Sequence, residues 1–128
     1  MARAATVMLA RLQREGLIDG VISLGGGGGT SIATAAMQGL PVGFPKVMVS
    51  TLASGNTSPY VGVKDIVMVP SIVDVSGINR ISRTILTRAA GAICGMVEAT
   101  VTPGDEKPIV VASMFGNTTK CVEHARGL

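Results

Sequence analysis

The chain has 128 residues, of which 47% are hydrophobic and 15% are charged, and its formal net charge is +3. This length suffices for one domain, and a modest charge without a basic cluster or an aromatic stacking platform argues against nucleic-acid binding. No charged residue occurs between Val21 and Pro45, but five glycines and Pro41 interrupt that stretch, so it does not predict a membrane span. Without a signal-peptide pattern after Arg3, the sequence favours a cytoplasmic protein.

The first predicted element is a helix over residues 2–16, with Gly16 at its end. Its apolar residues fall close to one face, namely Val7, Met8, Leu12 and Leu17. A short buried strand is then predicted over residues 19–24, and a helix of small residues over residues 30–39.

Five consecutive glycines separate that strand from that helix: Gly25, Gly26, Gly27, Gly28 and Gly29. A strand, a turn without side chains and a helix N-terminus direct unpaired N–H groups and the positive end of the helix dipole at an anion. Glycine suits such a turn because a Cβ would block a phosphate, and because these turns often need a positive φ. We therefore predict a phosphate or nucleotide site to which Thr30 and Ser31 add hydroxyl groups. The alternatives are simple helix capping by these hydroxyls and a flexible connector that binds nothing.

Two familiar phosphate motifs do not match this turn. A P-loop needs a Lys before the Ser or Thr, whereas Gly29 is followed directly by Thr30. A dinucleotide fingerprint needs a third small residue and an acid after the next strand. Here that strand ends in Ser50 and Thr51, and neither residue is acidic.

Two further strands are predicted over residues 46–50 and 65–69, with a loop rich in Ser, Gly, Asn and Pro over residues 51–62. A long helix is predicted from about Gly77 to Ala99, after a cap at Ser76. Helices between the strands predict an α/β fold with a Rossmann-like parallel sheet.

Ligands of such sheets lie beyond the carboxyl ends of the strands. Three loops are expected to converge there, over residues 25–30, 50–58 and 70–76. We add four residues of the second loop to the candidate site as its other wall, against the alternative of an ordinary polar loop: Ser50, Thr51, Ser54 and Gly55.

Three charged residues near the long helix have two interpretations each. Arg80 and Arg83 are able to reach a phosphate, although a solvated helix face is the commoner explanation. Asp74 is suited to hold a metal or a ribose, but helix capping is the favoured reading.

Small and sulfur-containing residues carry little chemistry here. Gly91 and Gly95 predict close helix packing, onto the sheet or across a dimer axis, with the sheet favoured. Cys94 and Cys121 are expected to be reduced, packed thiols. Cys121 and His124 lack a second ligand pair, so no metal site and no nucleophilic triad is predicted.

The chain is expected to be an incomplete doubly wound domain, because it opens on a helix without a first strand. Residues 1–101 form the C-terminal part of a first Rossmann-like subdomain, and residues 102–108 form a linker. Residues 109–128 begin a second subdomain with a strand over residues 109–113.

Residues 16–97, with their GGGGGT and VSTLASG motifs, resemble the Tm-1-like ATP-binding domain family, and KPIVVASMFGNTTKCVEHA resembles the opening of that family's second subdomain. The resemblance implies two Rossmann-like subdomains in full members, ATP binding and dimerisation. It matches the family motifs at Gly25 to Thr30 and at Val49 to Gly55. The family's N-terminal strands have no counterpart here, so part of the nucleotide pocket is expected to be absent.

The leading hypothesis is an ATP-binding module, with ATP accompanied by Mg²⁺ and the chain forming a homodimer. One alternative is part of an enzyme acting on a phosphorylated or carboxylated metabolite, although no general base stands out and no catalytic residue is assigned. Another is a structural or interaction fragment without a ligand.

Overall fold

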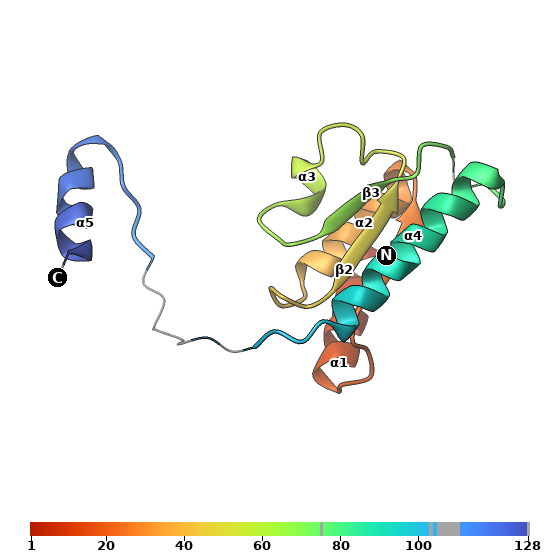
Figure 1. Cartoon of the computed structure of the whole chain (residues 1–128), viewed down its shortest axis with the longest axis horizontal. Coiled ribbons are helices and arrows are strands. Elements are labelled where there is room, and N and C mark those ends of the chain that lie inside the picture. Colours follow the sequence, from red (N-terminus) through yellow and green to blue (C-terminus); the bar gives the residue numbers. More distant parts are fainter. Residues whose placement is uncertain (75, 103, 105–110, 128) are drawn as a thin grey trace.

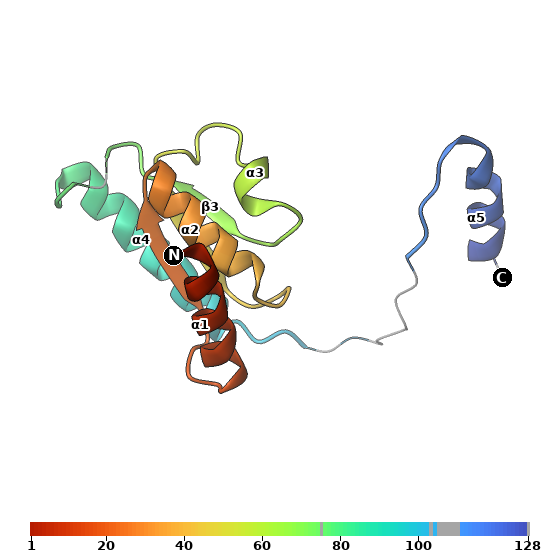
Figure 2. The same cartoon turned by 180° about the vertical axis from the view of Figure 1, so that it is seen from behind.

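The structure is a computed structural model that describes residues 1–74, 76–102, 104 and 111–127. Its elements in chain order are α1 (Ala2–Arg14), β1 (Val21–Gly25), α2 (Gly27–Gln38), β2 (Lys46–Ser50), α3 (Ser58–Val61), β3 (Val67–Pro70), α4 (Arg80–Glu98), the 3-10 helix η1 (Gly116–Thr118) and α5 (Thr119–Arg126). The three strands are parallel and lie in the order β1–β2–β3, which confirms the predicted α/β fold. Helix α4 lies on one side of the sheet (Figure 1) and helices α1 and α2 on the other (Figure 2).

The core lies on both faces of the central strand β2. Met48 packs with Met37 of α2 and with Ile66. Val47 and Val49 face the opposite side and pack with Ala89 of α4. All of β2 is buried, as expected of a strand in a parallel sheet with helices on both faces.

Two helices begin at residues other than those predicted. Helix α2 includes three of the glycines and starts at Gly27, not Thr30. Helix α4 starts at Arg80, not Gly77, because Asn79 caps it. The Asn79 Oδ1 accepts hydrogen bonds from the amides of Ile81 and Ser82 at 2.8 and 2.9 Å, and the Asn79 amide donates to Ser82 Oγ at 2.8 Å.

Other expectations need correction. The loop between the second and third strands contains the short helix α3. Among residues 111–113 of the predicted fourth strand the structure has no strand, while residues 109 and 110 lie outside the described residues. Of the predicted linker, the structure describes only residues 102 and 104, so the division into subdomains stays a prediction.

The small and sulfur-containing residues of α4 and α5 are also more exposed than expected. A Cβ built on Gly91 or Gly95 would meet nothing within 4 Å, so these glycines do not pack closely onto the sheet. Cys94 and Cys121 are free thiols on exposed residues, not packed ones.

Candidate functional site

The glycine turn lies where β1 ends and α2 begins. Gly26 is the N-cap of α2 and provides no side-chain cap. The Thr30 amide donates to the Gly26 carbonyl at 2.8 Å, as the first turn of a helix requires. The amides of Gly27, Gly28 and Gly29 precede that bond and therefore have no acceptor within the helix. These three residues are exposed, so the amides without a helical acceptor belong to an exposed first turn of α2.

The reason for glycine differs along this turn. None of the five has a positive φ, so that part of the prediction is wrong. A Cβ on Gly25 would lie 3.0 Å from the Gly29 Cα, which explains Gly25 by close backbone packing. For Gly26, Gly27 and Gly29 the nearest atom would be 3.6 Å away or more, and for Gly28 nothing lies within 4 Å. The fold itself therefore leaves room for a side chain at Gly26 to Gly29.

Two buried hydroxyls join the turn to the end of β2. Thr30 Oγ1 and Ser50 Oγ lie 2.6 Å apart, and both residues are fully buried. Thr30 Oγ1 also donates to the Gly25 carbonyl at 3.4 Å, and Ser50 Oγ accepts from the Leu52 amide at 3.0 Å. The structure thus places these two predicted site residues inside the protein, where they fix the turn against the loop that follows β2.

The second predicted wall does lie beside the turn. Thr51 donates its amide to the Gly25 carbonyl at 3.3 Å, and its Oγ1 would be 3.6 Å from a Cβ on Gly26. Thr51, Ser54 and Gly55 are exposed. Ser31 is exposed as well, and its hydroxyl donates to the Gly27 carbonyl at 3.0 Å. The surface next to these amides therefore carries hydroxyl groups from the start of α2 and from the loop after β2.

The third predicted loop meets the other two through its backbone. The Ser71 amide donates to the Ser50 carbonyl at 3.1 Å. Ile72 then has a φ of 64°, while the Val73 amide donates to the Ser71 carbonyl at 2.7 Å. A positive φ at a β-branched residue in so tight a turn is strained, and no signal in the sequence pointed to it.

The charged residues of the prediction lie in the first turns of α4 and in the loop before it. Arg80 and Arg83 are exposed on the first turns of α4, and no bond joins them to the glycine turn within the part of the chain that the structure describes. Asp74 does not cap α4, since Asn79 does. Asp74 lines a small recess together with Ser71 and Ser82.

A charged cluster that the sequence did not predict lies at the amino end of β2. The fully buried Lys46 Nζ donates to the carbonyls of Pro41 and Phe44 at 2.8 and 2.6 Å and contacts Asp65 Oδ1 at 2.9 Å. Burial raises the pKa of Asp65, but hydrogen bonds from Lys46 and Gly43 and the Lys46 charge outweigh it and hold this pKa below its ordinary value of 3.8.

None of the helices in the described ranges is both long enough and apolar enough to cross a bilayer.

Comparison with known proteins places the chain in a family. Residues 1–102 match the N-terminal domain of an uncharacterised protein family, UPF0261. A UPF0261 protein of Clostridium tetani is 55% identical over 98% of this chain and 31% of its own length. One from Mesorhizobium japonicum is 53% identical over 93% of this chain and 30% of its own length. The tomato (Solanum lycopersicum) ToMV resistance protein Tm-1 is 43% identical over 95% of this chain and 17% of its own length.

The chain thus spans a third or less of the length of these relatives. On the match over residues 1–102 and on these identities, the chain belongs to the UPF0261 family.

Proposed function

We propose that the chain forms the phosphate-binding part of a nucleotide site, with ATP as its ligand. The phosphates lie over the amides of Gly27, Gly28 and Gly29, and residues Thr51 to Gly55 form the other wall. The ATP assignment is supported by the resemblance of the GGGGGT and VSTLASG motifs to those of the Tm-1-like ATP-binding domain family.

The observation that carries the proposal is that glycine occupies positions where the fold does not need it. A Cβ at Gly26 to Gly29 would meet only ordinary contacts or none. Glycine is a poor helix former, and Gly27, Gly28 and Gly29 lie in the first turn of α2. A ligand that approaches the backbone closely explains glycine at these positions.

The groups next to the turn suit binding of an anion. Three exposed amides and the positive end of α2 favour negative charge, and the formal net charge of +3 has the matching sign. The hydroxyls of Ser31 and Thr51 supply oxygen atoms of the kind that Mg²⁺ prefers. Arg80 is the first residue of α4, so any contact that it makes with the phosphates would come from that side. The neighbouring side chains are hydroxyls and aliphatic groups, which favours binding over proton transfer.

The experiment is a nuclear magnetic resonance titration of the isotope-labelled chain with ATP and Mg²⁺. We expect the amide signals of Gly27, Gly28 and Gly29 to shift most, with smaller shifts in residues 51–55. Inorganic triphosphate should shift the same three amides, whereas adenosine should not. If ATP and triphosphate leave these amides unchanged while the chain is folded, the proposal is wrong.

A further inference from the structure

Strand β1 forms one edge of the sheet, and its outer side is unpaired within the described residues. The Val21 amide donates to Pro45 and the Gly25 carbonyl accepts from Thr51, so these residues direct their backbone groups towards β2. Successive residues of a parallel strand direct these groups to opposite sides. The N–H and C=O groups of Ile22 and Leu24 therefore point away from β2, along the open edge.

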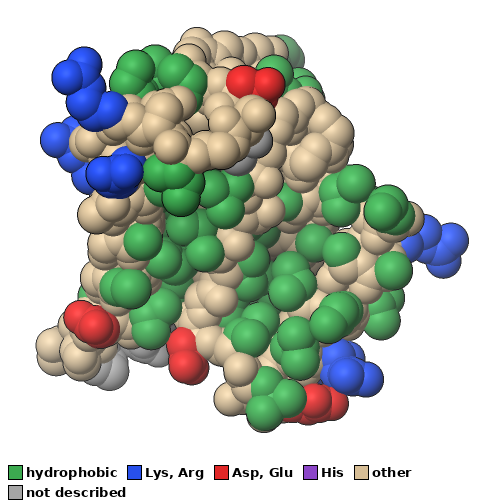
Figure 3. All heavy atoms as spheres, turned by 90° about the vertical axis from the view of Figure 1, so that its right-hand side faces the viewer, with side chains coloured by type: hydrophobic (Ala, Val, Ile, Leu, Met, Phe, Trp, Pro, Cys, Tyr) green, Lys and Arg blue, Asp and Glu red, His purple; other side chains and the backbone are tan. Residues whose placement is uncertain are grey.

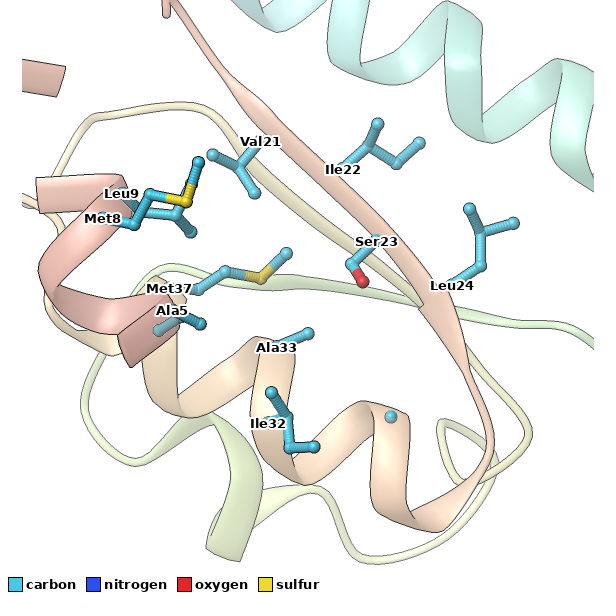
Figure 4. Close-up of a pocket in the computed structure, with 12 residues that line it drawn as sticks. Ala5, Met8, Leu9, Val21, Ile22, Ser23, Leu24, Ile32, Ala33 and Met37 are labelled. Atoms are coloured by element: carbon cyan, nitrogen blue, oxygen red, sulfur yellow. The ribbon is translucent and has the colours of Figure 1, made fainter. Parts of the chain in front are cut away.

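Apolar grooves lie on both faces of this edge. A groove of about 450 Å³ lies between β1, α1 and α2, and it is lined mostly by aliphatic side chains that include Met8, Leu9 and Ile32. A second groove, of about 310 Å³, lies between β1 and α4 and is lined by Ile22, Ile93 and Val97 among others. Figure 4 shows Val21 and Ser23 pointing towards α1 and α2, and Ile22 and Leu24 pointing to the other side.

The side chains of the edge strand are unusually exposed for their type. Ile22 and Leu24 are 40% and 43% exposed, and Val7 and Met8 of α1 more so. Figure 3 looks onto this side of the molecule, where hydrophobic side chains form a broad band and most charged ones lie at its margins. An apolar band of this kind indicates an interaction surface.

The helices give this surface the shape of a slot for one strand. Helix α1 packs chiefly against α2 and lies beyond β1, while the C-terminal half of α4 borders the edge on the opposite face. Both helix layers thus border a position beside β1 where the sheet has no strand within the described residues. A strand in that position would be buried on both faces, as strands of parallel α/β sheets are.

We propose that the outer edge of β1 binds one further apolar β-strand, parallel to β1, from the part of the longer family polypeptide outside the region matched by this chain. Its backbone would pair with Ile22 and Leu24, and its side chains would fill the two grooves. The chain spans 31% and 30% of the two bacterial relatives, so each of those polypeptides has residues available to supply such a strand.

A second copy of this chain fits the slot less well. Its own β1 is bordered by the same α1 and α4, so a second copy would bring two further helices to an edge that already has two. A single strand without flanking helices on that side fits between the layers. The proposal does not depend on nucleotide binding.

The first test is residue-level hydrogen exchange on the 128-residue chain and on the complete Clostridium tetani relative. In the chain alone, we expect the Val21 and Ser23 amides to be protected by β2 and the Ile22 and Leu24 amides to exchange fast. In the complete relative, the aligned positions of Ile22 and Leu24 should be slowed by about a hundredfold or more, because paired strand amides exchange only on opening. Equally fast exchange in both proteins would overturn the proposal.

The second test is copurification of the tagged chain with the segments of that relative outside the matched region, produced in the same cells. Ile22→Lys should reduce capture about tenfold or more, since it places a charge in the groove, and Ile22→Pro should do so by removing an edge donor. The matched control is Val67→Lys, because Val67 is 41% exposed on the opposite edge strand. Circular dichroism verifies that each variant is folded.

Two outcomes would contradict the proposal here. Capture that Ile22→Lys and Val67→Lys reduce equally would show that the β1 edge is not the binding surface. A mass of two chains by light scattering, returned to one by Ile22→Lys, would assign the edge to a second copy instead.

Discussion

The two ends of strand β2 carry polar groups that are used in opposite ways. At the amino end, the buried Lys46 Nζ has three oxygen partners, from Pro41, Phe44 and Asp65, so this cluster is closed. At the carboxyl end, the hydroxyls of Thr30 and Ser50 bond to each other, while the glycine amides beside them remain exposed. We therefore distinguish a polar cluster that holds the fold together from one that, in our proposal, supports a surface for an anion.

Replacing Lys46 should have the largest effect on stability. Lys46→Met removes the Nζ donor from two carbonyls and from the Asp65 carboxylate, so we expect a loss of about 3 kcal/mol in the free energy of unfolding. Urea denaturation measures it. The control is Lys64→Met, which removes one donor to the Leu40 carbonyl and should cost about 1 kcal/mol. Similar losses in the two variants would show that the Lys46 cluster stabilises the fold no more than a single hydrogen bond does.

Removing the Thr30 hydroxyl should have an intermediate effect. Thr30→Val leaves the buried Ser50 hydroxyl with one partner fewer, which should lower the free energy of unfolding by about 1–2 kcal/mol. It should also speed hydrogen exchange at the Leu52 amide, because Ser50 Oγ holds that amide. Thr34→Val is the control, since the Thr34 hydroxyl donates to Thr30 O within its own helix. An unchanged Leu52 amide in Thr30→Val would mean that the hydroxyl pair does not position the loop.

The smallest expected effect is on the pH dependence of stability. The lowered pKa of Asp65 means that the folded state binds its proton more weakly than the unfolded state. This contribution is complete above the ordinary pKa of 3.8 and is lost as the pH falls through the lower folded-state pKa. Asp65→Asn should therefore be less stable than the unaltered chain at about pH 6 and lose less stability on acidification to about pH 3. Parallel stability curves for the two proteins would contradict this assignment.

The sequence predicted the central part of the fold well. The apolar run from Lys46 to Ser50 is β2 with the predicted bounds, and the alternation of helices and strands led to the parallel sheet. It also placed the Thr51 loop beside the glycines, since the carboxyl ends of parallel strands share one edge. The predictions that were wrong concern residues at which tertiary contacts override local preference.

The helix starts show this most clearly. Glycine is a poor helix former, so the sequence favoured a helix start at Thr30. In the structure, bonds from Thr30 to Gly25, Gly26 and Ser50 hold this segment, and α2 starts at Gly27. Ser76 and Asn79 are both good caps by type, and only the bond between Asn79 and Ser82 selects one of them. The Lys46–Asp65 pair depends on the register of β2 and β3, which no local pattern specifies.

The most direct measurement of the central claim combines the stability and the ATP affinity of Gly28→Ala. A Cβ there meets nothing within 4 Å, so the free energy of unfolding should not fall. The affinity for ATP with Mg²⁺, measured by calorimetry, should fall by about tenfold or more because the methyl group blocks the phosphate. Gly91→Ala on α4, equally unhindered, should raise stability and leave affinity unchanged. Undiminished ATP affinity in Gly28→Ala, or no ATP binding by the unaltered chain, would contradict the account.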